Sequence, residues 1–344
     1  MHIPEKVRNL LYPAFEQART AIEKSGRIWI STHRNPDGDA IGSELALYHA
    51  LTAIGKKVEI VNCDPTPYNL MFTDRNSIVK SHENYHFDAS EVDLIIIADL
   101  NDSSRLGTLA PIFNESKAYK LLIDHHTEAN INVDLSIVNT EATSTGELVY
   151  YFLNFLEIEM NSDIAQNLYL AIMTDTGSFR FPRTDASTHQ IVADIMQYDV
   201  NPVEIYEQVY NTNSINSIHI LGSALKNITL HYGGQLAIMR ISAEMLNSAN
   251  ASNDDIDNFV NHTLSIDGTK IGVMIAEVIG SDELRISMRS KGKYSARKIS
   301  SHFGGGGHLN AAGARVKNIS LDEAYNQIIE FAESVIESAG IENE

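Results

Sequence analysis

The sequence has very little cysteine and no long hydrophobic run. Cys63 is the single cysteine of the 344 residues, so an internal disulfide is excluded. The first residues, Met-His-Ile-Pro-Glu-Lys, contain no apolar signal region. No apolar stretch approaches the roughly 20 residues that a membrane-spanning helix needs. These absences favour a cytoplasmic protein that does not enter a membrane.

Basic residues are scarce as well. The chain carries 26 Lys and Arg against 45 Asp and Glu, which gives a formal net charge of -19. This balance argues against binding of long duplex nucleic acid, because that affinity comes mostly from cations that neutralise phosphates. A small anionic substrate held by a few local basic groups stays compatible with it, especially if metal ions reverse the charge of the site.

Three apolar runs predict a parallel sheet in the first part of the chain. They are continuous rather than alternating, and segments of helical periodicity such as 41–54 separate them; the runs span 28–30, 94–98 and 121–123. Continuous apolar strands are typical of a parallel sheet covered by helices on both faces. We therefore expect an α/β fold in which ligands bind at the carboxyl ends of the strands.

The pattern changes near residue 226. Segments 235–241, 271–279 and 284–288 alternate between apolar and polar residues, which predicts a half-exposed sheet interrupted by short helices. We accordingly expect a first domain over 1–215, a helical connector over 216–225 and a smaller α/β domain over 226–344.

Potential metal ligands crowd the turn that follows the first strand. His33, Asp37 and Asp39 lie around Pro36 and Gly38, before a predicted helix. Two carboxylates and an imidazole confined this closely repel or desolvate one another unless a cation holds them. The alternative is a solvated loop in which the two aspartates act as turn and helix-capping residues.

Two further strands also end in ligand residues. Asp99 follows the run 94–98, and Asp124-His125-His126 follows the run 121–123. Each could cap a helix or form a surface turn, but the carboxyl ends of parallel strands share one rim. Asp175 adds another carboxylate at the end of a predicted helix. Its Asp-Thr-Gly triplet also matches aspartic proteases, but that chemistry pairs two such triplets and this chain has one.

Nitrogen and oxygen ligands without thiolate favour Mn2+, with Mg2+, Co2+, Fe2+ and Zn2+ as alternatives. The number of ligands is sufficient for two divalent cations, which together can clamp a phosphate and generate a hydroxide nucleophile.

A glycine run near the end of the chain is a second candidate site. Gly304 to Gly307 precede His308, and successive backbone N–H groups in such a run can converge on an anion. The alternative is a flexible hinge. Arg289 and Arg105 could bind phosphate or stabilise transition-state charge, or they could be ordinary surface charges.

In order and approximate spacing, these motifs resemble those of the DHH phosphoesterase superfamily. The N-terminal motifs are His33-x3-Asp37-x-Asp39, Asp99, Asp124-His125-His126 and Asp175. The C-terminal ones, Arg289-Ser290 and Gly304-Gly305-Gly306-Gly307-His308, resemble the DHH-associated domain. The resemblance covers nearly the whole chain. It implies a parallel-sheet DHH domain, a smaller α/β domain and an active site in the cleft between them.

The resemblance also implies roles for individual residues. One manganese would be held by His33, Asp37 and Asp99, and the other by Asp39, Asp99, His125 and Asp175, with Asp99 bridging. Asp124 would orient His125, and His126 would contact the scissile phosphate or protonate the leaving oxygen. Substrate contacts would come from Arg105, Arg289, Ser290, Gly305, Gly306, Gly307 and His308.

Chain length and the lack of extra domains most resemble the bacterial nanoRNase / 3'-phosphoadenosine-5'-phosphate phosphatase group. This implies hydrolysis of short oligoribonucleotides or nucleotide bisphosphates by in-line attack of a bridging hydroxide. The alternative within the superfamily is a cyclic- or linear-dinucleotide phosphodiesterase. Pyrophosphatase and long-strand exonuclease functions are less favoured, and a catalytically idle nucleotide-binding regulator is the alternative outside enzymes. A homodimer is compatible with the resemblance.

Overall fold

The computed structural model describes residues 5–127 and 130–341. The chain divides into two compact units, Met1–Thr212 and Asn213–Glu344. Residues 1–4 and 128–129 of the predicted first domain and residues 342–344 of the predicted second domain lie outside the described residues. Within the described part, no helix is both long and apolar enough to cross a membrane.

The first unit is built on a six-stranded parallel sheet of order β3-β2-β1-β4-β5-β6. The strands are β1 (Arg27–Ser31), β2 (Lys57–Asn62), β3 (Val79–Ser81), β4 (Leu94–Ala98), β5 (Tyr119–Asp124) and β6 (Leu135–Val138). All five residues of β4 are buried, as the continuous apolar run predicts.

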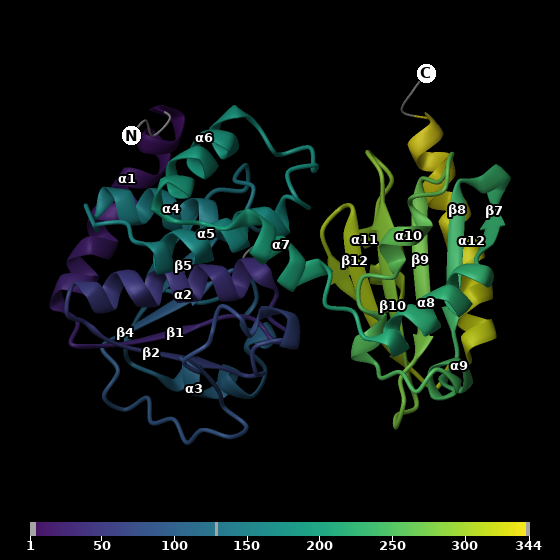
Figure 1. Ribbon diagram of the computed structural model, residues 1–344, viewed down its shortest axis with the longest axis horizontal. Helices are drawn as coiled ribbons and strands as arrows, with labels where there is room; N and C mark the ends of the chain where they lie inside the picture. Colours follow the sequence, from purple (N-terminus) through teal and green to yellow (C-terminus); the bar gives the residue numbers. More distant parts are fainter. Residues whose placement is uncertain (1–4, 128–129, 342–344) are drawn as a thin grey trace. The chain divides into compact units, whose positions relative to one another are not determined.

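Helices cover both faces of this sheet, which confirms the predicted α/β fold (Figure 1). One face packs against α1 (Glu5–Lys24), α2 (Gly38–Ala53), α4 (Thr145–Phe155) and α5 (Ser162–Asp175). The other packs against the 3-10 segment η2 (Ser103–Leu109) and helix α3 (Ala110–Glu115). The remaining helical elements are η1 (Tyr68–Leu70), α6 (Ala186–Ile195), η3 (Met196–Tyr198) and α7 (Pro202–Tyr210).

The second unit contains a mixed sheet of order β11-β12-β10-β9-β8-β7. Only the β8–β9 pair is parallel among its described strands, and the other pairs are antiparallel. The strands are β7 (Thr229–His231), β8 (Leu236–Ile241), β9 (Ile271–Glu277), β10 (Glu283–Ser290), β11 (Gly306–Gly307) and β12 (Ala311–Lys317).

Helices lie on both faces of the second sheet as well. Helices α11 (Ala296–His302) and α12 (Leu321–Ile341) form one hydrophobic cluster with it. The other cluster involves α8 (Ile215–Lys226), α9 (Ala243–Ser248), η5 (Asp254–Ile256) and α10 (Val260–Thr263). The turn between β7 and β8 contains the 3-10 segment η4 (Tyr232–Gly234).

The expectation of a half-exposed sheet is wrong for β8 and β9 and right for β10. Helices cover β8 and β9 from both sides, so nearly all of their residues are buried. In β10 buried and half-exposed residues alternate strictly. Helix α8 includes the residues predicted as connector, and its Ile220 and Ala224 pack in the second unit's core.

Candidate metal centre and substrate site

The candidate ligands of the first unit lie where the strand order of its sheet reverses. Strand β1 has β2 on one side and β4 on the other, although both β2 and β3 lie between β1 and β4 in the sequence. The loops that leave neighbouring strands on either side of such a point diverge, which creates space for a ligand beyond the carboxyl ends. His33 follows β1 and Asp99 follows β4.

The first group of ligand atoms comprises His33, Asp37 and Asp99, which can approach a common ion. The Nε2 atom of His33 lies 3.4 Å from Asp99 Oδ2 and 4.0 Å from Asp37 Oδ2. The other ring nitrogen, Nδ1, lies 2.8 Å from the carbonyl oxygen of Arg34. A proton on Nδ1 would donate to that carbonyl and leave Nε2 with a lone pair for a metal.

The second group comprises Asp39, His125 and Asp175. His125 Nε2 lies 3.8 Å from Asp39 Oδ2 and 3.4 Å from Asp175 Oδ2. It also lies 3.6 Å from Asp99 Oδ1. The two oxygens of Asp99 therefore face different histidines, which is the arrangement that a carboxylate bridging two ions requires.

At the start of helix α2, Asp37 acts as the predicted helix cap and also faces a second candidate ligand. Asp37 is the N-cap of α2, and its Oδ1 accepts hydrogen bonds from the amides of Asp39 and Ala40. Its Oδ2 is the oxygen that faces His33. One carboxylate thus caps the helix with one oxygen and presents the other to the site.

Asp39 is buried against the beginning of another helix. Its oxygens accept hydrogen bonds from the amides of Thr145 at 2.7 Å and Gly146 at 2.9 Å, in the first turn of α4. Unpaired amides at a helix N-terminus favour negative charge. They hold the Asp39 carboxylate in a fixed orientation, although only 1% of the residue is exposed.

Asp99 has a constrained backbone as well as a constrained side chain. Its φ of 57° lies in the left-handed region, which aspartate tolerates better than most residues. Its Oδ1 accepts a hydrogen bond from Thr145 Oγ1 at 3.0 Å. Together these features turn the carboxylate between the two ligand groups.

The charges of the cluster are poorly balanced without a cation. Burial and then the charge of Asp99 raise the pKa of Asp39 and of Asp175 well above the usual range. Burial opposes charge on Asp99 also, but its hydrogen bond with His33 and the nearby histidines hold its pKa low. Burial lowers the pKa of His125, which favours the neutral ring that metals bind. The donor set therefore fits divalent cations of the oxygen- and nitrogen-binding kind.

Asp124 contacts His126 rather than His125, which corrects the expected orienting contact. His126 Nδ1 lies 2.7 Å from Asp124 Oδ1, whereas His125 Nδ1 faces the carbonyl oxygen of Ala142 at 3.4 Å. In an extended segment, residues two apart point to the same side and adjacent residues to opposite sides. Burial lowers the pKa of His126, but the Asp124 hydrogen bond and the Asp99 charge outweigh it and raise the pKa to about 9.

Arg105 lies within electrostatic range of this cluster. Its charge lowers the pKa of both His33 and His126, although other groups outweigh it. The carbonyl oxygen of Arg105 accepts a hydrogen bond from the amide of Arg34 at 2.7 Å, which ties the loop after β4 to the loop after β1. The structure thus brings Arg105 near the candidate ligands.

In the second unit, Arg289 and the glycine run lie toward the same end of the sheet. Arg289 in β10 pairs with Ala311 in β12, and Gly307 in β11 pairs with Ala312. The amide of His308 donates to the carbonyl oxygen of Ala311 at 2.7 Å. Strand β12 therefore lies between Arg289 and the other predicted substrate residues of this region, Gly306, Gly307 and His308.

The glycine run is packed rather than loose. A Cβ atom at Gly305 would collide with the carbonyl oxygen of Gly313, and one at Gly307 with the backbone of Ala311 and Ala312. Gly307 also has a φ of 134°, which side chains rarely adopt. Close backbone approach, rather than hinge flexibility, accounts for glycine at these two positions.

Ser290 does not lie with the other predicted substrate residues. It alternates with Arg289 along β10 and is buried on the opposite face. Its hydroxyl donates to the carbonyl oxygen of Tyr294 at 2.5 Å and accepts from Asn310 Nδ2 at 2.9 Å. The geometry points to a role in holding the segment after β10.

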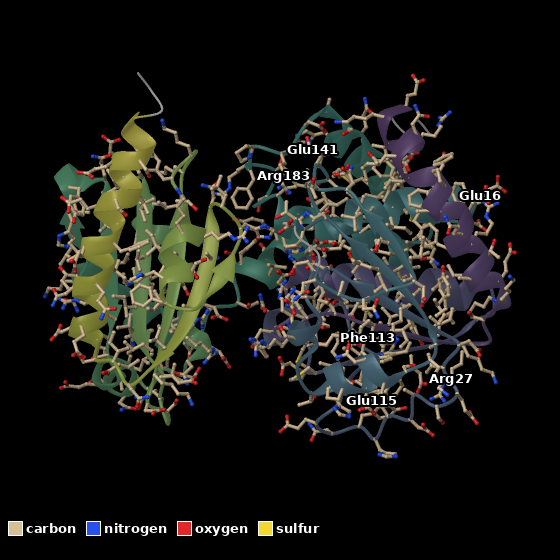
Figure 2. All side chains as sticks on the ribbon, turned by 180° about the vertical axis from the view of Figure 1, so that it is seen from behind. Glu16, Arg27, Phe113, Glu115, Glu141 and Arg183 are labelled. Atoms are coloured by element: carbon tan, nitrogen blue, oxygen red, sulfur yellow. The ribbon has the colours of Figure 1, made fainter. Side chains whose placement is uncertain are left out.

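Sequence reasoning missed two residues near the candidate ligands. Thr145 contacts both Asp39 and Asp99. Ser144 and Glu147 lie three residues apart, which is the helix-start pattern that could have located Thr145. Arg183, labelled in Figure 2, lowers the pKa of Asp175 against the larger effects that raise it. No local motif distinguishes this arginine.

Both units of the chain match known protein families. The model of the DHH family, N-terminal domain, matches residues 27–172, and the DHHA1 domain matches residues 233–338. The chain is 30% identical to the bifunctional oligoribonuclease and PAP phosphatase NrnA of Thermus thermophilus, over 92% of each chain. It is 27% identical to the protein of the same name from Bacillus subtilis, over 86% of this chain and 91% of that one.

A solved structure shares the fold over nearly the whole chain. It is the crystal structure of an exopolyphosphatase-related protein from Bacteroides fragilis, with a TM-score of 0.88 and 27% sequence identity. The match covers 94% of this chain and 98% of that chain. The chain belongs to the DHH family and combines the DHH domain with a DHHA1 domain. This confirms the family predicted from the motifs, and with it a phosphoester hydrolase.

Proposed function

We propose that this phosphoester hydrolase cleaves short oligoribonucleotides and removes the 3'-phosphate of 3'-phosphoadenosine 5'-phosphate at a centre of two divalent cations. The observation that carries the proposal is the position of Asp99, which belongs to the group of His33 and Asp37 and whose other oxygen lies 3.6 Å from His125 of the second group. Support for the substrate class comes from the names of the relatives, which describe an oligoribonuclease and PAP phosphatase.

The ligand assignment follows the two groups. His33, Asp37 and Asp99 would hold one cation, and Asp39, Asp99, His125 and Asp175 the other. When bound, the cations would lower the pKa of a water and neutralise charge on the phosphoryl oxygens. Mn2+ is the metal that we propose, because the ligands are carboxylates and imidazoles without a thiolate.

His126 has the charge that a phosphate site requires. Without bound cations, the Asp124 hydrogen bond and the Asp99 charge raise the pKa of His126 to about 9, and Asp124 fixes the orientation of the ring. It can stabilise the negative charge of the scissile phosphate or give a proton to the leaving oxygen. The positive charge of Arg105 acts on both His33 and His126.

The second unit would hold the part of the substrate that does not react. Arg289 offers a guanidinium that can bind a phosphate with two hydrogen bonds, and the glycines at 306 and 307 have no side chain that would keep an anion from the backbone. Binding at a distance from the reacting bond would position the scissile phosphate at the ligand groups.

The test is a substrate panel assayed on chelator-treated protein with and without added Mn2+. It contains di- to pentaribonucleotides, 3'-phosphoadenosine 5'-phosphate and cyclic dinucleotides. We expect Mn2+-dependent release of mononucleotides and of inorganic phosphate from the first two classes. Preference for cyclic dinucleotides would favour the alternative phosphodiesterase, and no turnover of any substrate would contradict the proposal.

A further inference from the structure

Three buried polar residues of the first unit form a continuous chain of hydrogen bonds. The hydroxyl of Thr32 donates to the carbonyl oxygen of Ala98 at 2.8 Å, and the Thr32 amide donates to Asn62 Oδ1 at 3.3 Å. Asn62 Nδ2 in turn donates to Glu44 Oε2 at 2.9 Å. All of these residues are fully buried, so water does not compete for the contacts. We call them the Thr32–Asn62–Glu44 chain.

The Asn62 side chain has only one orientation that satisfies both neighbours. A backbone amide can only donate, so Oδ1 of Asn62 has to face Thr32 and Nδ2 has to face Glu44. The paired residues of β1 and β2 end at Ile30 and Ile60. Two residues beyond this pair, the Asn62 side chain replaces the backbone of β2 as the acceptor for the Thr32 amide. The chain therefore extends the contact between the two strands past the end of their pairing.

Each end of the chain is next to a member of the first ligand group. His33 directly follows Thr32, and Asp99 directly follows Ala98. Asp37 is the N-cap of α2, the helix that contains the acid at the far end of the chain. The hydrogen bonds thus connect the three elements, β1, β4 and α2, whose ends place the ligand atoms of this group.

A role in stability alone does not account for an acid at position 44. Burying a carboxyl group costs free energy, and an apolar side chain of similar volume would fill the position without that cost. In the part of the chain that the structure describes, Glu44 Oε1 has no hydrogen-bond partner, which adds to the cost. The property that this position uses is the oxygen that accepts from Asn62.

We propose that Glu44, Asn62 and Thr32 are positioning residues that hold the three side chains of the first ligand group at the separation a divalent cation requires. None of the three belongs to either ligand group. The second group depends on them less, because His125 and Asp175 come from β5 and α5, which the chain does not reach. The inference rests on the proposed function, since it concerns how the protein prepares the first of the two proposed cation sites.

The experiment measures Mn2+ binding to chelator-treated protein, followed by the electron paramagnetic resonance signal of free Mn2+. It gives the number of sites and the Kd of each. For Glu44→Leu we expect one of two sites to weaken by about 10- to 100-fold and the other to stay within threefold of wild type. With saturating Mn2+, kcat for a dinucleotide should fall by about tenfold and KM should stay within twofold, because the residue touches no substrate.

Conservative variants show whether the hydrogen bond causes the effect. Glu44→Gln removes the ionisable group, as Glu44→Leu does, but keeps an oxygen that accepts from Asn62. Burial raises the pKa of Glu44 to about 8, so the amide also resembles the neutral acid present at pH 7. Glu44→Gln should therefore keep both Mn2+ Kd values within threefold of wild type.

The other end of the chain offers a second pair of variants. Thr32→Val removes the hydroxyl that contacts Ala98 and keeps the shape of the side chain, whereas Thr32→Ser keeps the hydroxyl. We expect Thr32→Val to weaken the same Mn2+ site by about tenfold and Thr32→Ser to stay within threefold of wild type. This pair decides the inference even where Glu44→Leu does not fold.

Asn167→Leu is the matched control for the loss of a buried hydrogen bond. Asn167 is buried in α5, and its Nδ2 donates to the carbonyl oxygen of Asp163 at 2.8 Å. Like Glu44, it has one oxygen without a partner among the described residues. In chelator, Asn167→Leu and Glu44→Leu should each lower Tm by roughly 2–8 °C. Asn167→Leu should bind Mn2+ as wild type does.

Unchanged Mn2+ binding in both Glu44→Leu and Thr32→Val would overturn the inference. An equal loss in Glu44→Gln would show that the charge matters rather than the acceptor, and an equal loss in Asn167→Leu would show that any destabilisation has this effect. Either result also overturns it. Failure of the proposed function is seen in wild type, as no hydrolysis of the substrate panel, whereas the inference is decided by Mn2+ binding.

Discussion

The two units place their charged groups in opposite environments. In the first unit, Asp39, Asp99 and His125 are each at most 3% exposed and surrounded by a sheet and helices. In the second, Arg285 and Arg315 lie on a sheet face that solvent reaches. The first arrangement shifts pKa values strongly, whereas the second keeps arginine charges available to a ligand.

The difference follows from how each sheet is covered. A parallel sheet needs crossover helices on its faces, so side chains at its carboxyl rim are enclosed by the loops between strands and helices. An antiparallel pair such as β10 and β12 needs no crossover helix and can leave one face to solvent. The candidate metal ligands thus lie where burial is unavoidable, and the arginines of β10 and β12 lie where it is not.

The largest effect should come from removing the shared ligand of the buried cluster. Asp99→Asn keeps the side-chain shape but removes the charge between the two ligand groups. We expect Mn2+-dependent turnover to fall by roughly three orders of magnitude, since several kcal/mol of charge stabilisation are lost. The rise in Tm that Mn2+ gives to wild type should also disappear.

Asp102→Asn is the matched control, because Asp102 accepts hydrogen bonds from the amide of Ser104 and from Asn130 and belongs to neither ligand group. It should keep both turnover and the response of Tm to Mn2+. Substantial turnover in Asp99→Asn would show that the bridging assignment is wrong.

In the second unit, Arg289→Ala should weaken binding more than chemistry. Loss of charge-assisted hydrogen bonds to phosphate should raise KM by about 10- to 100-fold and change kcat by only a few-fold. Steady-state kinetics on a dinucleotide with saturating Mn2+ measure both constants. An unchanged KM would remove Arg289 from the substrate site.

A buried acid outside both ligand groups should make the stability of the first unit depend on pH. Glu44 is fully buried in α2, and its Oε2 accepts a hydrogen bond from Asn62 Nδ2 at 2.9 Å. Burial raises its pKa to about 8, although the Asn62 hydrogen bond opposes the increase. An unfolded glutamate has a pKa near 4.3, so the folded state binds the extra proton between these values.

The stability that neutral Glu44 provides is therefore complete below about pH 4.3 and is lost as the pH rises to about 8. A tenfold difference in proton affinity between the folded and unfolded states corresponds to roughly 1.4 kcal/mol. Relative to Glu44→Gln, wild type should lose unfolding free energy over this range. Urea unfolding at several pH values, with chelator present, measures the difference. Parallel pH profiles of the two proteins would show that Glu44 does not titrate in this range.

The smallest effect should come from Ser290→Ala. Loss of the hydroxyl that bonds Tyr294 and Asn310 should lower the free energy of unfolding by about 1 kcal/mol. KM for a dinucleotide should stay within twofold of wild type, because the hydroxyl faces away from Arg289. A large rise in KM with unchanged thermal stability would restore the predicted substrate contact.

The parts of the fold that sequence predicts well are those where burial is uniform. The run at 94–98 is β4 to the residue, because a strand enclosed on both faces contains apolar residues throughout. Strand β12 is hard to predict, because its alternation depends on Ala312, Gly313 and Ala314, small residues with weak β-propensity. The edge strands β3 and β6 are short, which gives periodicity little to act on.

The sequence predicts which residues gather at the candidate site, but it predicts less well which of their side chains contact one another. Strand ends place Asp99 and Asp124 on one rim from sequence alone, since the rim is a property of parallel topology. Which histidine Asp124 contacts depends on the direction of individual side chains after β5. The contact of Thr145 with Asp39 joins α4 to α2; the spacing of Ser144 and Glu147 marks the start of α4 but does not indicate this contact.

The order of the strands has a consequence for how the protein is made. Strand β1 and its first ligand, His33, leave the ribosome early, but their neighbour β4 follows only after β2 and β3 have been synthesised. Asp175, at the end of α5, comes later still. All residues of the two candidate ligand groups are therefore present together only after translation has passed that aspartate.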